Sequence, residues 1–204
     1  MWMTCIAGDL PPSRRDEGIE IISSLGFHDL FAEKPYDRGW IYRGCQGGMI
    51  ADIIWSFANY RTEVSERWLE RAPRVLIRGT QVPLLPVEEL LWAKLHIMHR
   101  DRCDWPDLLN VLYRCGEQVD WDHLLGLIGE DAGLLGGLLA TFAWICPGRA
   151  RALPRWLWRR VGLLEPAAPR SGEAAPDVDW ARVNLLEHRE WFGPAPDLAE
   201  EDRP

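Results

Sequence analysis

The stretch that decides the fold is residues 86–125, PVEELLWAKLHIMHRDRCDWPDLLNVLYRCGEQVDWDHLL. Its apolar residues recur at helical spacing, as in Leu90, Leu91 and Leu95, and acidic residues stand where new helices are expected to begin. Before residue 86, short β-branched and apolar runs alternate with glycine turns, which is typical of strands. The sequence therefore predicts an α+β protein that changes from a mixed sheet to all helix near residue 86.

Upstream of residue 86 the pattern predicts two helices and two hairpins. The first helix is capped by Ser13 and runs to Leu25, and a hairpin joins Trp40–Arg43 to Met49–Ser56 across a glycine-rich turn. A short helix over Glu63–Ala72 and a second hairpin around Gly79-Thr80 follow. The hairpin strand Met49–Ser56 carries one acidic residue, Asp52.

Downstream, helices are expected after Asp104 and Asp120, over Ala132–Ile145 and over Pro154–Val161. We expect three parts: an α/β part over residues 1–85, a helical part of the same globular domain over residues 86–165, and an acidic linker and tail over residues 166–204. Within the tail, Trp180–Trp191 could form a short amphipathic segment. It either folds back on the body or docks another protein.

Length and composition bound the class of protein. The chain has 204 residues, of which 47% are hydrophobic and 26% charged, enough to bury a core. The net charge is −8, but residues 166–204 hold nine acidic residues and four arginines, so that the rest of the chain is close to neutral. A near-neutral body gives no bulk electrostatic reason to expect duplex nucleic acid or an anionic membrane as a partner.

The sequence indicates a cytoplasmic protein. Met1–Leu10 lacks the basic start and apolar run of a secretory signal. The longest charge-free stretch, Ala132–Gly148, is interrupted by glycines and falls short of the ~20 apolar residues that a bilayer requires, so we expect a buried helix there. Five cysteines, odd in number and widely spread, do not resemble a disulfide framework.

Lys94 and Asp52 are the charged residues at positions that favour burial. Lys94 is one of two lysines in the chain and falls on the apolar face of its helix. It either extends to solvent or meets an anion, which could be a ligand phosphate or the carboxylate of Asp52, Asp104 or Asp107. Asp52 interrupts an apolar strand, so it is paired, metal-bound or protonated if it points inward, and an outward-facing position at the mouth of a cleft is equally allowed.

Two further features admit a structural explanation. Asp104, with Asp107 three residues later, is what a helix start favours, so capping is the first interpretation of both residues. His96, His99 and Cys103 share one helical stripe, with Cys115 as a conceivable fourth zinc ligand. Because the helix is expected to break before Asp104, we favour packed or solvated side chains over a metal site there.

Residues 76–160 resemble the second half of bacterial nucleotidyltransferase-fold proteins, the group that includes minor nucleotidyltransferases and abortive-infection toxin nucleotidyltransferases. The shared order is a hairpin, P-x-E-[ED] with a lysine further along the helix, a basic stretch, D-x-x-D and D-W-D-x-L. In this sequence the order is represented by Pro86, Glu88, Glu89, Lys94, Asp104, Asp107 and Asp120-Trp121-Asp122. The similarity extends weakly upstream, where Ala51-Asp52-Ile53-Ile54 looks like the strand that bears a third catalytic carboxylate.

The resemblance implies a mechanism and a set of residues. A Gly-Ser turn would hold the phosphates of an NTP, and three carboxylates on adjacent strands would hold two Mg²⁺ ions that promote transfer of a nucleoside monophosphate to a hydroxyl acceptor. By position, Asp52 resembles a metal-binding catalytic carboxylate, and Lys94 resembles the lysine near the triphosphate. Asp104 and Asp107 resemble downstream acids that are catalytic or orient Lys94.

The sequence departs from that family before residue 13. The Gly-Ser turn and the paired D-x-D strand should precede the Ser13 helix, but Met1–Pro12 offers a single acidic residue, Asp9. The sequence thus predicts a truncated nucleotidyltransferase-like fold that lacks these strands. Two hypotheses remain: a transferase that is complete only with further sequence or a partner, with an RNA, a protein or a small molecule as acceptor, and a catalytically inactive relative that binds a ligand or a protein.

Overall fold

The computed structural model of the chain describes residues 5–57, 60–100, 102–167 and 175–186, with the side chains of residues 5–7 left out of the description. It combines helices with a mixed sheet, so the α+β class predicted from the sequence is confirmed. The chain divides into two compact units. Residues 1–76 and 81–86 form the first, called here the sheet unit, and residues 77–80 and 87–204 form the second, called the helical unit.

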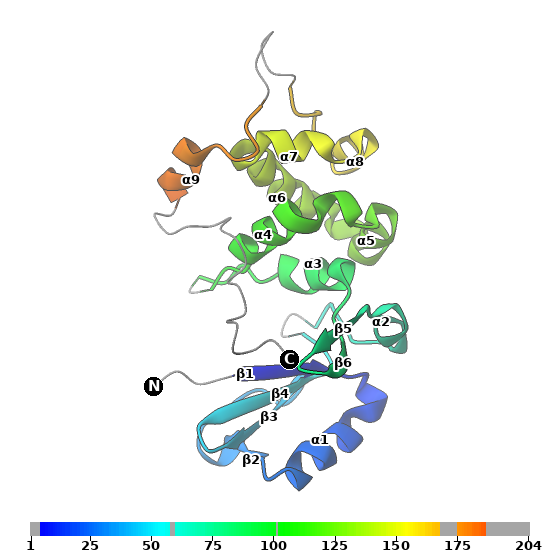
Figure 1. The fold of residues 1–204 in the computed structure, drawn as a ribbon, viewed down its shortest axis with the longest axis vertical. Helices are drawn as coiled ribbons and strands as arrows, with labels where there is room; N and C mark the ends of the chain where they lie inside the picture. The colour runs from blue at the N-terminus through cyan, green and yellow to red at the C-terminus, as the bar shows by residue number, and fades with distance from the viewer. Residues whose placement is uncertain (1–4, 58–59, 101, 168–174, 187–204) are drawn as a thin grey trace. The chain divides into compact units, whose positions relative to one another are not determined.

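The sheet unit is built on a four-stranded sheet of order β1-β4-β3-β2 (Figure 1). β1 runs parallel to β4, and the remaining neighbours are antiparallel. The elements of the unit are β1 (Cys5–Asp9), α1 (Arg15–Ser24), β2 (His28–Asp29), β3 (Ile41–Gln46), β4 (Met49–Ile54), α2 (Glu66–Arg71), β5 (Arg74–Ile77) and β6 (Thr80–Pro83), the last two being a separate hairpin whose tip is assigned to the helical unit.

The hairpin β3–β4 follows from its turn. Gly47 and Gly48 have φ angles of 55° and 84°, values that glycine adopts at no steric cost. Two such residues make the tight turn that matches the twist of paired strands, and they fix the register from Gln46 opposite Met49 onward. The predicted hairpin is confirmed, and its first strand is longer than expected because Gly44 lies within β3.

Two small apolar clusters cover the sheet. On one face, where Figure 1 shows α1 lying against the strands, Tyr42, Ile53 and Trp55 pack with Ile19 and Ile22. On the opposite face Cys45 and Ile50 pack with Leu30 and Tyr36. Since side chains alternate along a strand, Asp52 projects to the face opposite α1, as Ile50 does.

The helical unit has one continuous core. Its helices are α3 (Val87–Leu95), α4 (Trp105–Cys115), α5 (Trp121–Ile128), α6 (Ala132–Ile145), α7 (Pro147–Ala152), α8 (Arg155–Arg160) and α9 (Trp180–Leu186). α6 is central, because Leu135, Leu138, Leu139, Phe142 and Ile145 are all fully buried. α7, which the sequence analysis did not predict, begins at Pro147, where proline suits a first helical turn.

The tail segment folds back on this core. α9 contacts α6, Val183 is buried, and the backbone N–H of Asp179 donates to the carbonyl of Ile145 at 2.7 Å. This confirms the first of the two expectations for the segment, as far as Leu186. Trp191 lies outside the described residues.

One stretch, Trp121–Ile145, is long and apolar enough to cross a membrane by length and composition. It consists of α5 and α6, which are separated at Gly129, where φ is 57°. The buried leucines of α6 belong to the helical core, which agrees with the buried helix predicted from the sequence.

Two features before residue 16 differ from the sequence-based expectations. The sequence predicted no strand in Met1–Pro12, whereas Cys5–Asp9 forms β1 beside β4. The Ser13 cap is wrong, because α1 begins at Arg15 after a 3₁₀ turn over Pro12–Arg14 and has no side-chain cap.

Candidate functional site

Asp52 lies in the middle of β4 and is 6% exposed. The guanidinium of Arg43 donates two hydrogen bonds to it, Nε to Oδ1 at 2.7 Å and Nη2 to Oδ2 at 2.8 Å. The two residues are direct partners across the β3–β4 ladder. A bidentate pair of this kind offsets the cost of burying a carboxylate and engages both of its oxygens.

The residues opposite Asp52 on the neighbouring strands determine whether it can form part of a two-metal site. Its partner on β3 is Arg43, and its partner on β1 is Ala7, so neither neighbouring position supplies a second carboxylate. Asp9 is two residues beyond Ala7 and therefore faces the same side of the sheet as Asp52. The described residues of this sheet do not fit a pair of bridged Mg²⁺ ions, which need several carboxylate oxygens free for ligation.

Asp9 lines a cavity of about 370 Å³ within the sheet unit. The other walls are largely apolar: Gly8, Trp68, Leu69, Ala72, Val82, Pro83, Leu84, Leu85 and Pro86. Burial raises the pKa of Asp9 to about 6, because the charged carboxylate loses solvation there. No hydrogen bond or ion pair of its side chain is found among the described residues.

Lys94, Asp104 and Asp107 come together in the helical unit. Nζ of Lys94, at the end of α3, lies 2.7 Å from a carboxylate oxygen of Asp104 and 2.7 Å from one of Asp107. Arg102 adds two hydrogen bonds to Asp104, from Nε at 2.9 Å and from Nη2 at 3.0 Å. This cluster, here the Lys94 cluster, joins two cations to two anions and has no formal net charge.

The pKa values of the Lys94 cluster show that the pairing outweighs the burial. Partial burial by itself lowers the pKa of Lys94, but the hydrogen bonds from its ammonium to Asp104 and Asp107 raise it above that of free lysine. Burial by itself raises the pKa of Asp104, but the hydrogen bonds from Arg102 and Lys94 bring it below its usual range. Lys94 and Asp104 are therefore both charged at neutral pH.

The loop between α3 and α4 explains why Asp104 meets Lys94. Met98 and Cys103 form an isolated bridge, and the N–H of Asp104 donates to the carbonyl of Ile97 at 3.0 Å, so the chain doubles back beside α3. The expectation that the Asp104 side chain caps α4 is wrong: it precedes the helix but makes no capping hydrogen bond. The Asp120 side chain does cap α5, accepting from the N–H of His123 at 3.0 Å.

The histidine and cysteine stripe does not form a metal site among the described residues. Nε2 of His96 lies 3.2 Å from Asp131, and Cys103 is in the loop rather than on α3.

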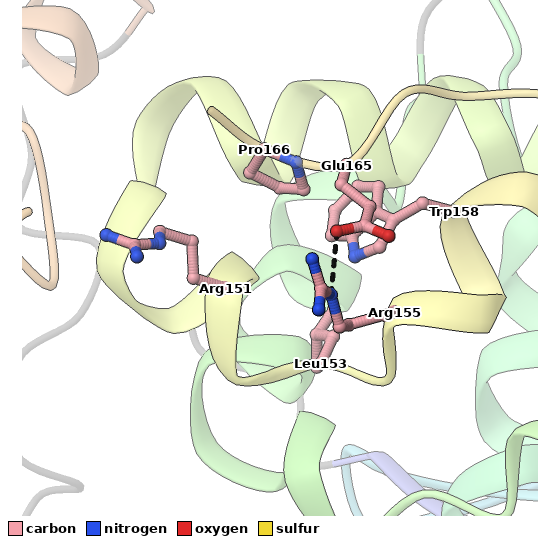
Figure 2. Close-up of a pocket in the computed structure, with 6 residues that line it drawn as sticks. All are labelled: Arg151, Leu153, Arg155, Trp158, Glu165 and Pro166. Atoms are coloured by element: carbon pink, nitrogen blue, oxygen red, sulfur yellow. Dashed lines mark hydrogen bonds and ion pairs between the residues drawn. The ribbon is translucent and has the colours of Figure 1, made fainter. Parts of the chain in front are cut away.

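The helical unit has a polar hollow of about 320 Å³ beside α7 and α8 (Figure 2). In Figure 2, Glu165 lies over Trp158 and is joined to Arg155, with 2.8 Å between its Oε2 and Nε, while Arg151 lies apart from that pair. Because Arg155 is highly exposed and already paired, the hollow presents one further cation at most to a ligand.

The predicted site residues are thus divided between the two units, Asp52 in the sheet unit and Lys94, Asp104 and Asp107 in the helical unit. The sequence analysis missed the roles of Arg43 and Arg102. A two-residue turn at Gly47-Gly48 would have placed Arg43 opposite Asp52, so that signal was available. The role of Arg102 depends on the loop geometry and had no comparable signal.

No protein-family model matches this sequence, and no curated protein or solved structure shows significant similarity to it. The functional argument therefore depends on the residues themselves.

Proposed function

We propose that this chain is a nucleotidyltransferase-like protein that binds a ligand or a protein and does not transfer nucleotides by itself. The observation that carries the proposal is the surroundings of Asp52, whose strand partners are Ala7 and Arg43. Two-metal chemistry needs carboxylates on both sides of the metal pair. The bidentate bond to Arg43 would also have to break before Asp52 could ligate Mg²⁺.

The Lys94 cluster supports the same proposal. A lysine that binds a triphosphate must present positive charge to it. Lys94 instead bonds two carboxylates, and Arg102 completes the balance of charge. We assign Lys94, Asp104 and Asp107 the role of holding α3 and α4 together.

The cavity beside Asp9 is the proposed binding site. Its volume of about 370 Å³ falls within the range of small-molecule pockets, about 300–1,000 Å³. An ammonium group would pair with the carboxylate of Asp9 and offset its lost solvation, and the apolar walls would take a hydrophobic body. The ligand class is therefore a small amphiphile with one basic group.

A protein partner is proposed for the tail. Trp180, Leu185 and Leu186 remain exposed on α9 although Val183 is buried. Exposed apolar side chains mark an interaction surface where they form one contiguous patch, so the proposal requires a partner that covers Trp180 together with Leu185 and Leu186.

Nucleotide transfer remains a second candidate because Asp9 and Asp52 face the same side of the sheet. The reaction would move a nucleoside monophosphate from an NTP to a hydroxyl of an RNA, a protein or a small molecule. It would require Mg²⁺ and carboxylates from outside the described residues. In that case Asp52 is the proposed metal ligand, and the role of Lys94 at the triphosphate stays an expectation from the resemblance.

Thermal melting distinguishes the two candidates. The purified chain is melted with Mg²⁺ and each of the four NTPs, and separately with phenethylamine and its uncharged analogue phenethyl alcohol, at pH 7.5. A ligand at about 100 times its Kd stabilises a protein by about 2.7 kcal/mol, a shift of a few degrees. We expect no shift with the NTPs and a shift with the amine that Asp9→Asn abolishes. An NTP shift that disappears in both Asp52→Asn and Lys94→Ala would instead support the transferase.

A further inference from the structure

Three side chains with metal-binding atoms meet at the edge of the sheet, and neither Asp52 nor Asp9 is among them. They are His28 on β2, Glu33 just after the 3₁₀ turn η2 (Leu30–Ala32), and Cys45 on β3. Nε2 of His28 lies 3.0 Å from Oε1 of Glu33 and 2.9 Å from Sγ of Cys45. Sγ of Cys45 lies 3.8 Å from the same Glu33 oxygen.

Local structure brings the three together. His28 and Cys45 are direct partners in the β2–β3 ladder, so their side chains project from the same face. Asp29 then caps η2 by accepting from the N–H of Phe31 at 2.9 Å. The N–H of Glu33 donates to the carbonyl of Leu30 at 2.9 Å, which turns the chain so that Glu33 returns beside His28.

The use of one ring nitrogen argues against a proton relay. In a nucleophile–histidine–acid triad, the two ring nitrogens face different partners. Here Nε2 of His28 faces both the carboxylate and the sulfur. A neutral imidazole nitrogen can donate or accept only one proton, so Nε2 cannot pass a proton between these two partners. The convergence of Nε2, the Glu33 oxygen and the Cys45 sulfur on one point is instead an arrangement that suits ligation of an ion.

The separations suit a tetrahedral ion. Nitrogen, oxygen and sulfur ligands of zinc lie about 3.4–3.6 Å apart when bond lengths are about 2.0–2.3 Å. The three measured separations, 2.9, 3.0 and 3.8 Å, straddle that range. A shift of about half an ångström in the exposed His28 and Glu33 side chains would complete the geometry.

We propose that His28, Glu33 and Cys45 bind a divalent transition-metal ion of the zinc type, with a fourth position open to water. A thiolate, a carboxylate and a neutral imidazole together carry two negative charges, which match a dication. The sulfur and nitrogen donors select zinc-like ions over Mg²⁺, which takes oxygen ligands. His28 and Glu33 are exposed while Cys45 is buried, so the open position faces solvent.

The ion would stabilise the end of the sheet. β2 has two residues and stands at the edge, where few ladder hydrogen bonds hold it. Ligation would tie β2 and η2 to β3. This inference is independent of the proposed binding function.

Titration of the metal-free, reduced full chain with Co²⁺ tests the proposal. Cobalt bound by a thiolate gives a charge-transfer band in the near ultraviolet, and its visible bands report tetrahedral geometry. We expect both signals in the natural chain and in Cys103→Ser, a control at an exposed cysteine in the helical unit. Cys45→Ser should lose the charge-transfer band, and Zn²⁺ should displace the cobalt.

Surface variants cover the case in which Cys45→Ser fails to fold. His28→Gln and Glu33→Gln alter exposed side chains, and each should raise the Kd for Co²⁺ at least about tenfold, since loss of even an outer-shell partner costs 10–100-fold. Glu20→Gln, on α1, should leave the Kd unchanged. The proposal is overturned if no cobalt spectrum forms, if the band persists in Cys45→Ser, or if the His28 and Glu33 variants bind as tightly as the natural chain.

Discussion

The sheet unit and the helical unit differ in the surroundings of their charged side chains. In the helical unit the Lys94 cluster is balanced, with Lys94 and Arg102 against Asp104 and Asp107, and it stands beside one continuous apolar core. The sheet unit has two small apolar clusters and keeps Asp9 in an apolar cavity without a described counter-ion. The contrast supports the proposal that the Lys94 cluster serves stability and that the ligand site is the cavity beside Asp9.

Phe142→Ala tests the continuous core. Phe142 is fully buried in α6, so its truncation removes buried apolar surface and leaves a cavity, and we expect a loss of about 3–5 kcal/mol in the free energy of unfolding. Ile50→Ala, in a small cluster of the sheet unit, should cost about 2 kcal/mol, since that cluster can adjust. Urea unfolding measures both. Equal losses would remove the distinction between the two cores.

Arg43→Ala tests whether Asp52 depends on its partner. The substitution leaves a buried carboxylate without its bidentate donor, which we expect to cost about 2–3 kcal/mol after allowing for the partial exposure of Arg43. Arg43→Lys keeps the positive charge but loses the paired geometry, so its free energy of unfolding should lie between those of the natural chain and Arg43→Ala. Urea unfolding at pH 7 measures the series. An Arg43→Ala protein as stable as the natural one would show that Asp52 is held in another way.

Asp9→Asn tests the uncompensated carboxylate. The pKa of Asp9 is raised from 3.8 to about 6, so the folded state binds the proton more tightly than the unfolded state. Stability should therefore fall as pH rises from about 4 to about 6, and remain lower above that window. Asp9→Asn removes this fall and should be more stable than the natural chain at pH 7, by about 2 kcal/mol. Melting temperatures between pH 4 and 8 test this, and parallel profiles for the two proteins would contradict it.

Asp104→Asn and Asp107→Asn measure the separate contributions of the two carboxylates of the Lys94 cluster to stability. The lowered pKa of Asp104 means that its contribution is complete above its unfolded pKa of 3.8 and is lost as pH falls through the lower folded value. Asp104→Asn should cost about 1–2 kcal/mol at pH 7, and the exposed Asp107→Asn less than about 1 kcal/mol. Urea unfolding at pH 7 and at pH 3 measures both. A larger loss for Asp107→Asn would contradict the assigned roles.

Much of the fold could be predicted because local signals were strong. Gly47-Gly48 fixed the hairpin, and helical periodicity with Asp120 marked α5. β1 could not be predicted from Cys5–Asp9, because a short strand with small residues depends on pairing with β4. Asp104 has a local capping preference, but its side chain instead bonds Arg102, two residues earlier, and Lys94 on α3.

The candidate site was less predictable from the sequence because it depends on contacts between residues that are far apart along the chain. The sequence left open whether Lys94 extends to solvent or meets an anion, and the structure shows that it bonds the carboxylates of Asp104 and Asp107. His28, Glu33 and Cys45 are separated along the chain and come together only through the β2–β3 register and the turn η2. No sequence spacing marks such a group.

Release of pyrophosphate from each NTP in the presence of Mg²⁺ is the most direct measurement of whether the sheet unit carries a two-metal centre. The purified chain, Asp52→Asn and a buffer control are incubated with each NTP and with RNA or small hydroxyl compounds as acceptors. We predict that the chain releases no more pyrophosphate than buffer and that Asp52→Asn behaves identically. Mg²⁺-dependent release by the natural chain that Asp52→Asn abolishes would contradict the proposed function.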